Sequence, residues 1–166
     1  MNQSYISIWN DFVNPEDTVI HVGDFCWDGV QQLRSFYDQL NGSLLLVKGN
    51  HDSVSPDESP IPIVESTIIR SGKYRFWVTH DPSDVPSEWT EWIIHGHTHG
   101  DTPFMDRQKS QMNVSVDVTE GIPIPVYALE SLFDNCPRGG SYDTIRDSTA
   151  FHHQWYIDNG MGMPHQ

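Results

Sequence analysis

Four short polar motifs follow apolar runs of this chain, and this arrangement constrains the fold more than any other feature. Each motif begins where a run rich in Val, Ile or Leu ends. The motifs are Gly23-Asp24, Gly49-Asn50-His51-Asp52, Thr79-His80 and His95-Gly96-His97-Thr98-His99. Strands of an α/β sheet deliver loop residues to a ligand site at such positions. A carboxylate, an amide oxygen and several imidazoles brought together there would suit one or two divalent transition metals.

The apolar patterns predict helices and strands that alternate along the chain, as in a layered α/β fold. Helical spacing indicates helices over 4–13 and 30–40. The expected strands are 19–22, 44–47, 63–69, 74–78, 92–94, 112–118 and 125–129. Between the second and third of these strands, residues 53–62 contain three prolines and indicate a loop on the rim of the site.

Length and charge limit the classes of protein that the chain can belong to. Its 166 residues suit one domain, and 23 acidic against 9 basic side chains give a net charge of −14. This charge repels nucleic-acid backbones and anionic membranes, so extensive nucleic-acid binding is not expected. The 2 cysteines do not suggest a disulfide framework. Without a signal peptide or a spanning segment, we expect a cytoplasmic protein, which includes a virus-encoded protein inside its host.

The character of the sequence changes near Leu132. Residues 134–141 have the composition of a linker, and the remainder mixes aromatic residues, Gly and Pro without a clear period. We therefore expect a domain over 1–132 and a C-terminal tail over 133–166. The oligomeric state is left open.

The order of the motifs resembles the signature of the calcineurin-like metallophosphoesterases, which runs Asp-x-His, Gly-Asp, Gly-Asn-His-Asp/Glu, His and Gly-His-x-His. The likeness to the small phage and bacterial branch of that superfamily extends to about Leu132. The first block, Asp-x-His, has no counterpart before Gly23. The implied fold is α/β, with two packed mixed β-sheets flanked by helices, in a form that is shortened at the N-terminus.

The resemblance implies a ligand set for divalent metals that consists of Asp24, Asn50, His80, His97 and His99. Asp24 would bridge two metals, and capping of the following helix is its structural alternative. Asn50, His80 and His97 would complete the second metal position, whereas His99 would serve the first. Mixed oxygen and imidazole ligands suit Mn, Fe, Ni, Co or Zn, of which Mn is favoured here.

The resemblance also implies catalytic roles for His51 and Asp52. His51 would lie next to the scissile phosphate, where an imidazolium stabilises developing charge or protonates the leaving oxygen. Asp52 would orient His51 and raise its basicity. In the alternative, Asp52 caps a turn and His51 is exposed to solvent.

The remaining histidines are interpreted as structural or exposed residues, because a lone histidine at a strand end is usually one of these. They are His21, His95, His152, His153 and His165. His95 is expected to support the site without binding metal.

The implied activity is hydrolysis of a phosphomonoester or phosphodiester by attack of a metal-activated water on a small phosphorylated substrate. The missing Asp-x-His block would supply half of the ligands of the first metal. A catalytically weak or inactive metal-binding protein with a binding or regulatory role is therefore the alternative.

Overall fold

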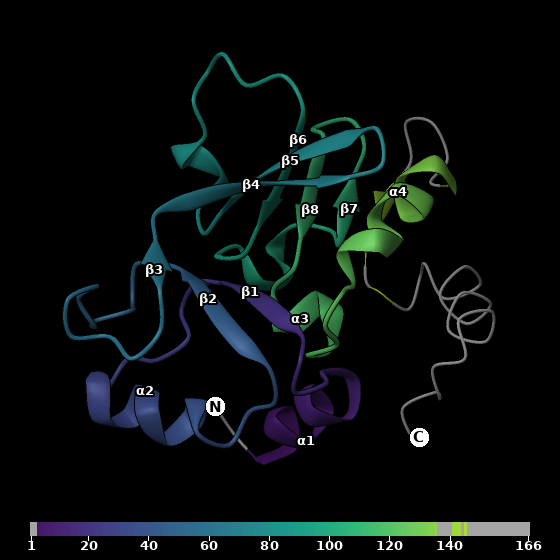
Figure 1. The fold of residues 1–166 in the computed structure, drawn as a ribbon. Coiled ribbons are helices and arrows are strands. Elements are labelled where there is room, and N and C mark those ends of the chain that lie inside the picture. The colour runs from purple at the N-terminus through teal and green to yellow at the C-terminus, as the bar shows by residue number, and fades with distance from the viewer. Residues whose placement is uncertain (1–2, 136–140, 144, 146–166) are drawn as a thin grey trace.

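The structure, a computed structural model, describes residues 3–135, 141–143 and 145, and these form two β-sheets with helices around them (Figure 1). In chain order the elements are α1 (Gln3–Phe12), β1 (Thr18–Val22), α2 (Val30–Tyr37), β2 (Ser43–Val47), β3 (Ile63–Val64), β4 (Ser66–Ser71), β5 (Tyr74–Thr79), η1 (Pro82–Asp84), β6 (Trp92–His95), η2 (His99–Asp101), β7 (Met105–Asp106), β8 (Gln111–Asn113), α3 (Val116–Thr119), α4 (Val126–Asn135) and β9 (Ser141–Tyr142). The predicted α/β fold with two sheets flanked by helices is confirmed.

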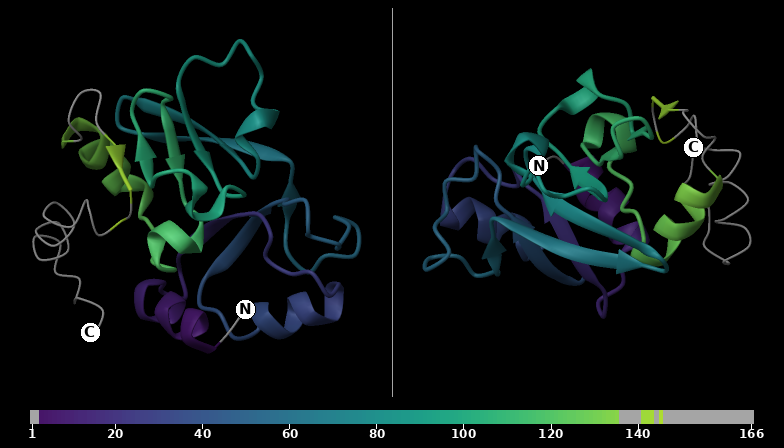
Figure 2. Two further views of the ribbon diagram at one scale, coloured as in Figure 1. Left: turned by 180° about the vertical axis from the view of Figure 1, so that it is seen from behind. Right: turned by 90° about the horizontal axis from the view of Figure 1, so that it is seen from above.

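The smaller sheet contains three parallel strands in the order β1-β2-β3. Figure 1 and the left view of Figure 2 show α1 and α2 on the same side of this sheet and the larger sheet on its other side. The sequence of β2 explains this arrangement, because successive side chains of a strand point to opposite faces. Leu44 and Leu46 pack toward the helices with Trp9 and Leu33, whereas Val47 packs toward the larger sheet.

The larger sheet is mixed and has the strand order β4-β5-β6-β8-β7-β9. Its central strands β5, β6 and β8 run parallel to one another, and antiparallel neighbours flank them. The motifs that contain His80 and His97 follow β5 and β6, so the parallel pairing brings the two motifs to the same edge of the sheet.

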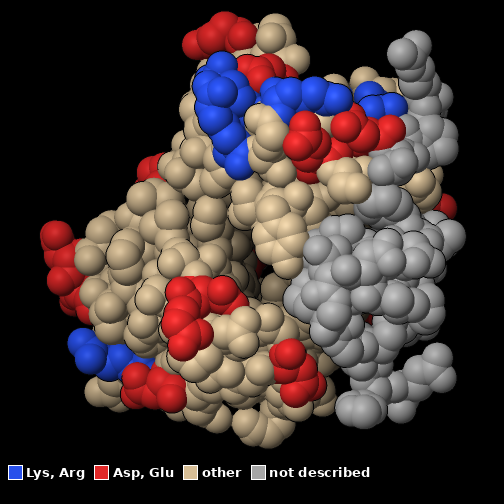
Figure 3. All heavy atoms as spheres, turned by 45° about the vertical axis from the view of Figure 1, so that its right-hand side comes forward, with Lys and Arg blue, Asp and Glu red and all other residues tan. Residues whose placement is uncertain are grey.

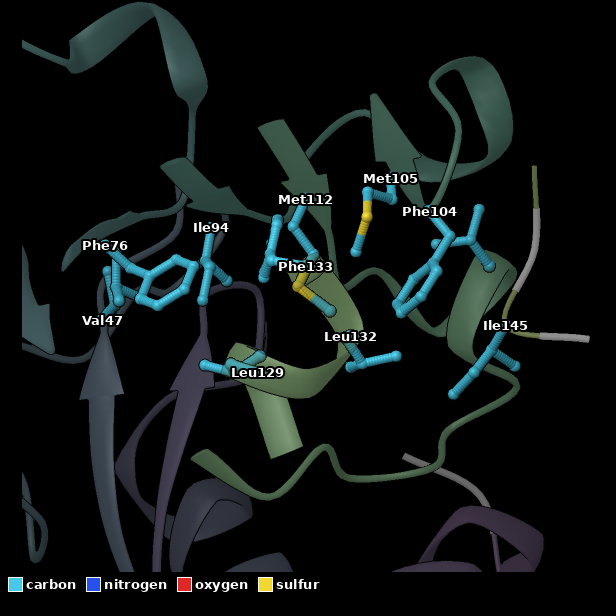
Figure 4. Close-up of a cluster of buried hydrophobic side chains, with 12 residues drawn as sticks. Val47, Phe76, Ile94, Phe104, Met105, Met112, Leu129, Leu132, Phe133 and Ile145 are labelled. Carbon is cyan, nitrogen blue, oxygen red and sulfur yellow. The ribbon is translucent and has the colours of Figure 1, made fainter. Parts of the chain in front are cut away.

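The main hydrophobic core lies between the larger sheet, the smaller sheet and α4 (Figure 4). Phe76, Met112 and Phe133 are fully buried there, although they come from β5, β8 and α4. Phe133 lies beyond the expected domain boundary at Leu132, which falls inside α4. Ile145 packs into the same core, and β9 pairs with β7.

One predicted strand proves to be two strands in different sheets. The run expected at 63–69 divides at Glu65 into β3, which pairs with β2, and β4, which pairs with β5. Both pieces are rich in β-branched residues, so local propensity does not reveal the change of sheet.

Two other predicted strands are wrong. The run expected at 112–118 ends as strand β8 at Asn113 and continues as helix α3, and the strand expected at 125–129 is the start of α4. Pro125 lies next to the first residue of α4, where its missing N–H is tolerated. Leu129, Leu132 and Phe133 then repeat at helical spacing and are buried, a period that a five-residue segment cannot display.

The second predicted helix is shorter than expected: α2 ends at Tyr37 and not at Leu40. Residues 38–40 form tighter turns in which Gln39 and Leu40 donate their N–H groups to the carbonyl oxygens of Phe36 and Tyr37.

Candidate metal centre

The buried carboxylate of Asp52 joins the two loops that carry Asp24 and Asn50. Asp52 is 5% exposed, and its Oδ2 accepts hydrogen bonds from the backbone N–H groups of Asp24 and Gly49, both at 2.8 Å. Its Oδ1 accepts a third, from Cys26 N at 3.0 Å. Three donors to one carboxylate make a strong connection between segments far apart in the sequence. Asp52 thus fixes the end of β1 against the end of β2.

Four of the five expected metal ligands converge between these loops and the larger sheet. His80 Nε2 lies 3.0 Å from Asn50 Oδ1 and 3.5 Å from Asp24 Oδ2. His97 Nδ1 lies 3.1 Å from Asn50 Oδ1 and 3.2 Å from His80 Nε2. We call these four residues the donor cluster. It contains one carboxylate oxygen, one amide oxygen and two imidazole nitrogens that face one another.

The hydrogen bond on the far side of the His80 ring indicates which ring nitrogen carries a proton. His80 Nδ1 lies 2.9 Å from the carbonyl oxygen of Val22, which can only accept a hydrogen bond, so Nδ1 carries the proton. In the neutral ring Nε2 then has a free lone pair, and it faces oxygen acceptors of Asn50 and Asp24. A cation among these acceptors removes their mutual repulsion, and a backbone carbonyl on the second nitrogen is typical of histidines that bind metal.

The carboxylate of Asp81, which is outside the predicted ligand set, lies behind the His97 ring. Asp81 Oδ2 lies 3.5 Å from His97 Nε2, on the side of the ring opposite the cluster. A hydrogen bond from the backbone N–H of Ser83 holds the pKa of Asp81 below its usual value, and His97 adds to this effect. Asp81 therefore stays ionised beside His97. Its position directly after His80 is the signal that could have identified it.

Backbone strain concentrates at the expected ligands. Asp24, His97 and His99 have φ angles of 54°, 63° and 49°, although L-residues other than Gly rarely adopt positive values. Such strain persists where the surrounding structure holds it, and it is often found at functional sites. Gly23 and Gly49 allow the close packing, because a Cβ at these positions would overlap the His80 ring and the Asp24 carboxylate, respectively.

His99, the fifth expected ligand, is not part of the donor cluster. Its Nδ1 lies 2.9 Å from Asp117 Oδ2, and both side chains are largely exposed, at 75% and 48%. Within the part of the chain that the structure describes, no group of three or more His, Cys, Asp or Glu side chains has the arrangement of a metal site. In the donor cluster, three members are His or Asp, and the fourth, Asn50, contributes an amide oxygen.

His51 is exposed. It lies next to the donor cluster because its backbone N–H donates a hydrogen bond to Asp24 Oδ1 at 3.0 Å. Its ring stacks on Trp27 with 4.3 Å between the ring centroids. The expected contact between Asp52 and the His51 ring is replaced by the backbone contacts described above. Asp52 is therefore a positioning residue, and its role as a turn cap agrees with the structural alternative.

Two of the histidines interpreted as structural pack against the core, His21 half-buried and His95 buried. His21 packs between Trp9 and Phe25, and burial lowers its pKa to about 4. His95 is 1% exposed, and burial lowers its pKa as well. His152, His153 and His165 lie outside the described residues.

Comparison with known proteins places this fold in a superfamily. Residues 5–116 match the calcineurin-like phosphoesterase superfamily domain, and the chain belongs to this superfamily, whose members are generally metal-dependent phosphoesterases. The uncharacterized protein MJ1445 of Methanocaldococcus jannaschii is 29% identical over 154 residues, which cover 89% of this chain and 81% of that protein.

Comparison with solved structures also gives matches to this chain. The protein of unknown function AQ665 from Aquifex aeolicus has a TM-score of 0.58 and 22% identity, with 78% of this chain and 83% of that chain covered. A single mutant of Vps29 from Entamoeba histolytica has a TM-score of 0.42 and 17% identity, with 69% of this chain and 63% of that chain covered.

Among the described residues, no helix has the length and apolar character to cross a membrane.

Proposed function

We propose that this chain is a phosphoesterase that depends on a divalent metal and hydrolyses a small phosphomonoester or phosphodiester with water. The observation that carries the proposal is the convergence of four donor atoms: His80 Nε2 faces Asn50 Oδ1, Asp24 Oδ2 and His97 Nδ1 at 3.0–3.5 Å. Asp24, Asn50, His80 and His97 would hold the metal. Their mixed donors suit Mn, Fe, Ni, Co or Zn, and Mn is the first metal to test.

The chemistry divides between the bound metal and the protein. A divalent cation in this position supplies Lewis acidity toward water and phosphoryl oxygens. His51 stabilises the negative charge of the phosphoryl group or donates a proton to the leaving oxygen. Asp52 keeps the two loops at a fixed separation, and Asp24 Oδ1 holds the backbone of His51 beside the cluster.

The decisive experiment is Mn-dependent hydrolysis of an aryl phosphomonoester and an aryl phosphodiester by the wild-type chain and by His97→Ala. The proposal predicts turnover that requires Mn and is lost in the variant, while circular dichroism shows the same fold for both proteins. Mn-dependent turnover that His97→Ala leaves unchanged would contradict the assignment of the site.

The second candidate is a catalytically weak or inactive protein that binds metal for a binding or regulatory role. The pairing of His99 with Asp117 favours it, because within the described residues this pairing leaves one of the two expected metal positions without a converged donor set. Saturable Mn binding by a folded wild-type chain, without turnover of either ester, would support this candidate over the enzyme.

A further inference from the structure

A cavity beside the donor cluster is lined by Trp27, an aromatic side chain that is largely exposed to solvent. A cavity of about 490 Å³ opens next to Asp24, within the range of small-molecule sites. Trp27, Asp28, Gln32 and Phe36 are among the residues that line it. Trp27 is 64% exposed although it is a large apolar residue. Because Asp24 belongs to both the cavity wall and the donor cluster, a group in this cavity adjoins the proposed reaction centre.

The exposed indole of Trp27 is held in place by its surroundings. Its ring stacks on His51 at an interplanar angle of 20°, and its carbonyl oxygen accepts a hydrogen bond from Ser53 Oγ at 3.1 Å. The preceding residue, Cys26, is anchored through its N–H to Asp52. One face of the indole is thus occupied, and the high exposure of the residue leaves further aromatic surface open to a ligand. A fixed aromatic surface stacks a planar ring at low entropic cost.

The polar residues of the cavity define what such a ring should carry. The carboxylate of Asp28 accepts hydrogen bonds, and the amide of Gln32 both donates and accepts them. A nucleobase presents both kinds of group on its edges, whereas a plain aryl ring presents neither.

The charges around the cavity also argue against a polyphosphate. None of the described residues that line it is Lys or Arg. Lys73 directly precedes β5 and Arg75 is its second residue, and they form ion pairs with Asp134 at 2.7 Å and Glu91 at 2.9 Å, respectively. On the face shown in Figure 3, Lys and Arg side chains gather mainly along the upper part and also occur at the lower left, in both places next to acidic ones.

We infer that the cavity beside Trp27 binds the base of a mononucleotide whose phosphoester is the substrate of the donor cluster, with Trp27 as a specificity-determining residue. This inference rests on the proposed phosphoesterase function. The phosphate then lies at Asp24 and His51, and the base stacks on the indole.

Adenosine, guanosine, cytidine and uridine 5′-monophosphates, each compared with ribose 5-phosphate, test this inference with Mn present. Every pair shares the same 5′-phosphoester and differs at C1′, where the nucleotide carries the base and ribose 5-phosphate carries a hydroxyl. For at least one nucleotide, kcat/KM should exceed that of ribose 5-phosphate, and Trp27→Ala should reduce this ratio by about 10-fold, as expected for loss of base stacking. Trp27→Phe should restore most of the ratio. Tyr127→Ala, which removes another exposed aromatic side chain, should leave it unchanged.

The two hypotheses fail in different ways. Equal kcat/KM for all nucleotides and ribose 5-phosphate, or a ratio that Trp27→Ala leaves unchanged, would overturn the inference and leave the phosphoesterase function standing. If the wild type hydrolyses none of them, binding of the four nucleosides without phosphate is measured by saturation-transfer NMR. Nucleoside binding that Trp27→Ala abolishes, without turnover of the aryl phosphomonoester and phosphodiester, would keep the base site and reject the phosphoesterase. Absence of nucleoside binding and of nucleotide hydrolysis would overturn the inference, and absence of aryl ester turnover as well would overturn both.

Discussion

The two sides of the candidate centre differ in how firmly their expected ligands are held. On one side, His80 is buried, its Nδ1 bonds the carbonyl of Val22, and its Nε2 faces Asn50 and Asp24. On the other side, His99 is 75% exposed and pairs with Asp117, also exposed. Both histidines belong to motifs of the same type. The comparison teaches that a motif supplies a ligand's chemistry, whereas burial and a second hydrogen bond supply its orientation. The following experiments test this difference, from the largest expected effect to the smallest.

Removal of the Asp52 carboxylate should have the largest effect, on stability. Asp52→Ala leaves three buried or half-buried N–H groups without their charged acceptor, so the free energy of unfolding should fall by about 3–5 kcal/mol. Asp117→Ala, on the exposed side, should change it by about 0.5 kcal/mol or less. Urea unfolding measures both variants. Equal losses would show that the two sides are held alike.

Removal of the His80 imidazole should weaken Mn binding by more than about 100-fold, because even loss of a supporting residue behind a ligand costs about 10- to 100-fold. Isothermal titration calorimetry with Mn measures the change, and circular dichroism confirms that the variant is folded. A small loss of affinity would place the metal elsewhere.

Acidification should destabilise the buried side through His21. Burial lowers its pKa to about 4 in the folded protein, against about 6.5 in the unfolded chain. Between these values the unfolded chain takes up a proton that the folded protein does not. The contribution of neutral His21 to the free energy of unfolding is therefore complete above pH 6.5 and is lost as the pH falls toward 4. We expect a loss of about 2 kcal/mol, which is less than the full pKa shift implies because His21 is only part-buried.

His21→Phe isolates this effect, since a phenyl ring keeps the packing against Trp9 and Phe25 but does not titrate. Urea unfolding of both proteins between pH 7 and pH 4 should show a smaller loss in the variant. Parallel curves would assign the acid sensitivity to other groups.

Neutralisation of Asp81 should reduce Mn affinity by about 10-fold, because the carboxylate no longer supports His97 from behind. Asp81→Asn keeps the size of the side chain, and Asp84→Asn, an exposed position in the same 3-10 turn, is the matched control. Identical affinities for the two variants would remove Asp81 from the site.

Removal of the His99 side chain should have the smallest effect. His99→Ala breaks only an exposed contact with Asp117, so we expect less than about a threefold change in Mn affinity. A loss as large as that of His80→Ala would show that both sides bind metal equally.

Much of the fold was predictable because the early elements show clear periodicity. The helix at the start and the first two strands occur within one or two residues of their expected bounds. The errors fall where a short apolar segment has no distinguishing period, as at α4, or where one β-rich run serves two sheets, as at β3 and β4. Strand and helix compete on equal terms in such segments, and packing decides between them.

The sequence by itself determined the fold class and the kinds of side chain at the candidate site. The apolar runs and the motifs after them predict an α/β fold and the ligand types, since both depend on residue identity and local spacing alone. Only the tertiary structure decided which motif residues meet. It brought together Asp24, Asn50, His80 and His97. Asp52 binds backbone N–H groups rather than the His51 ring, and Asp81 lies behind His97. His99 pairs with Asp117 away from the donor cluster. These outcomes depend on distances between segments that lie far apart in the sequence, and the packing of two sheets sets those distances.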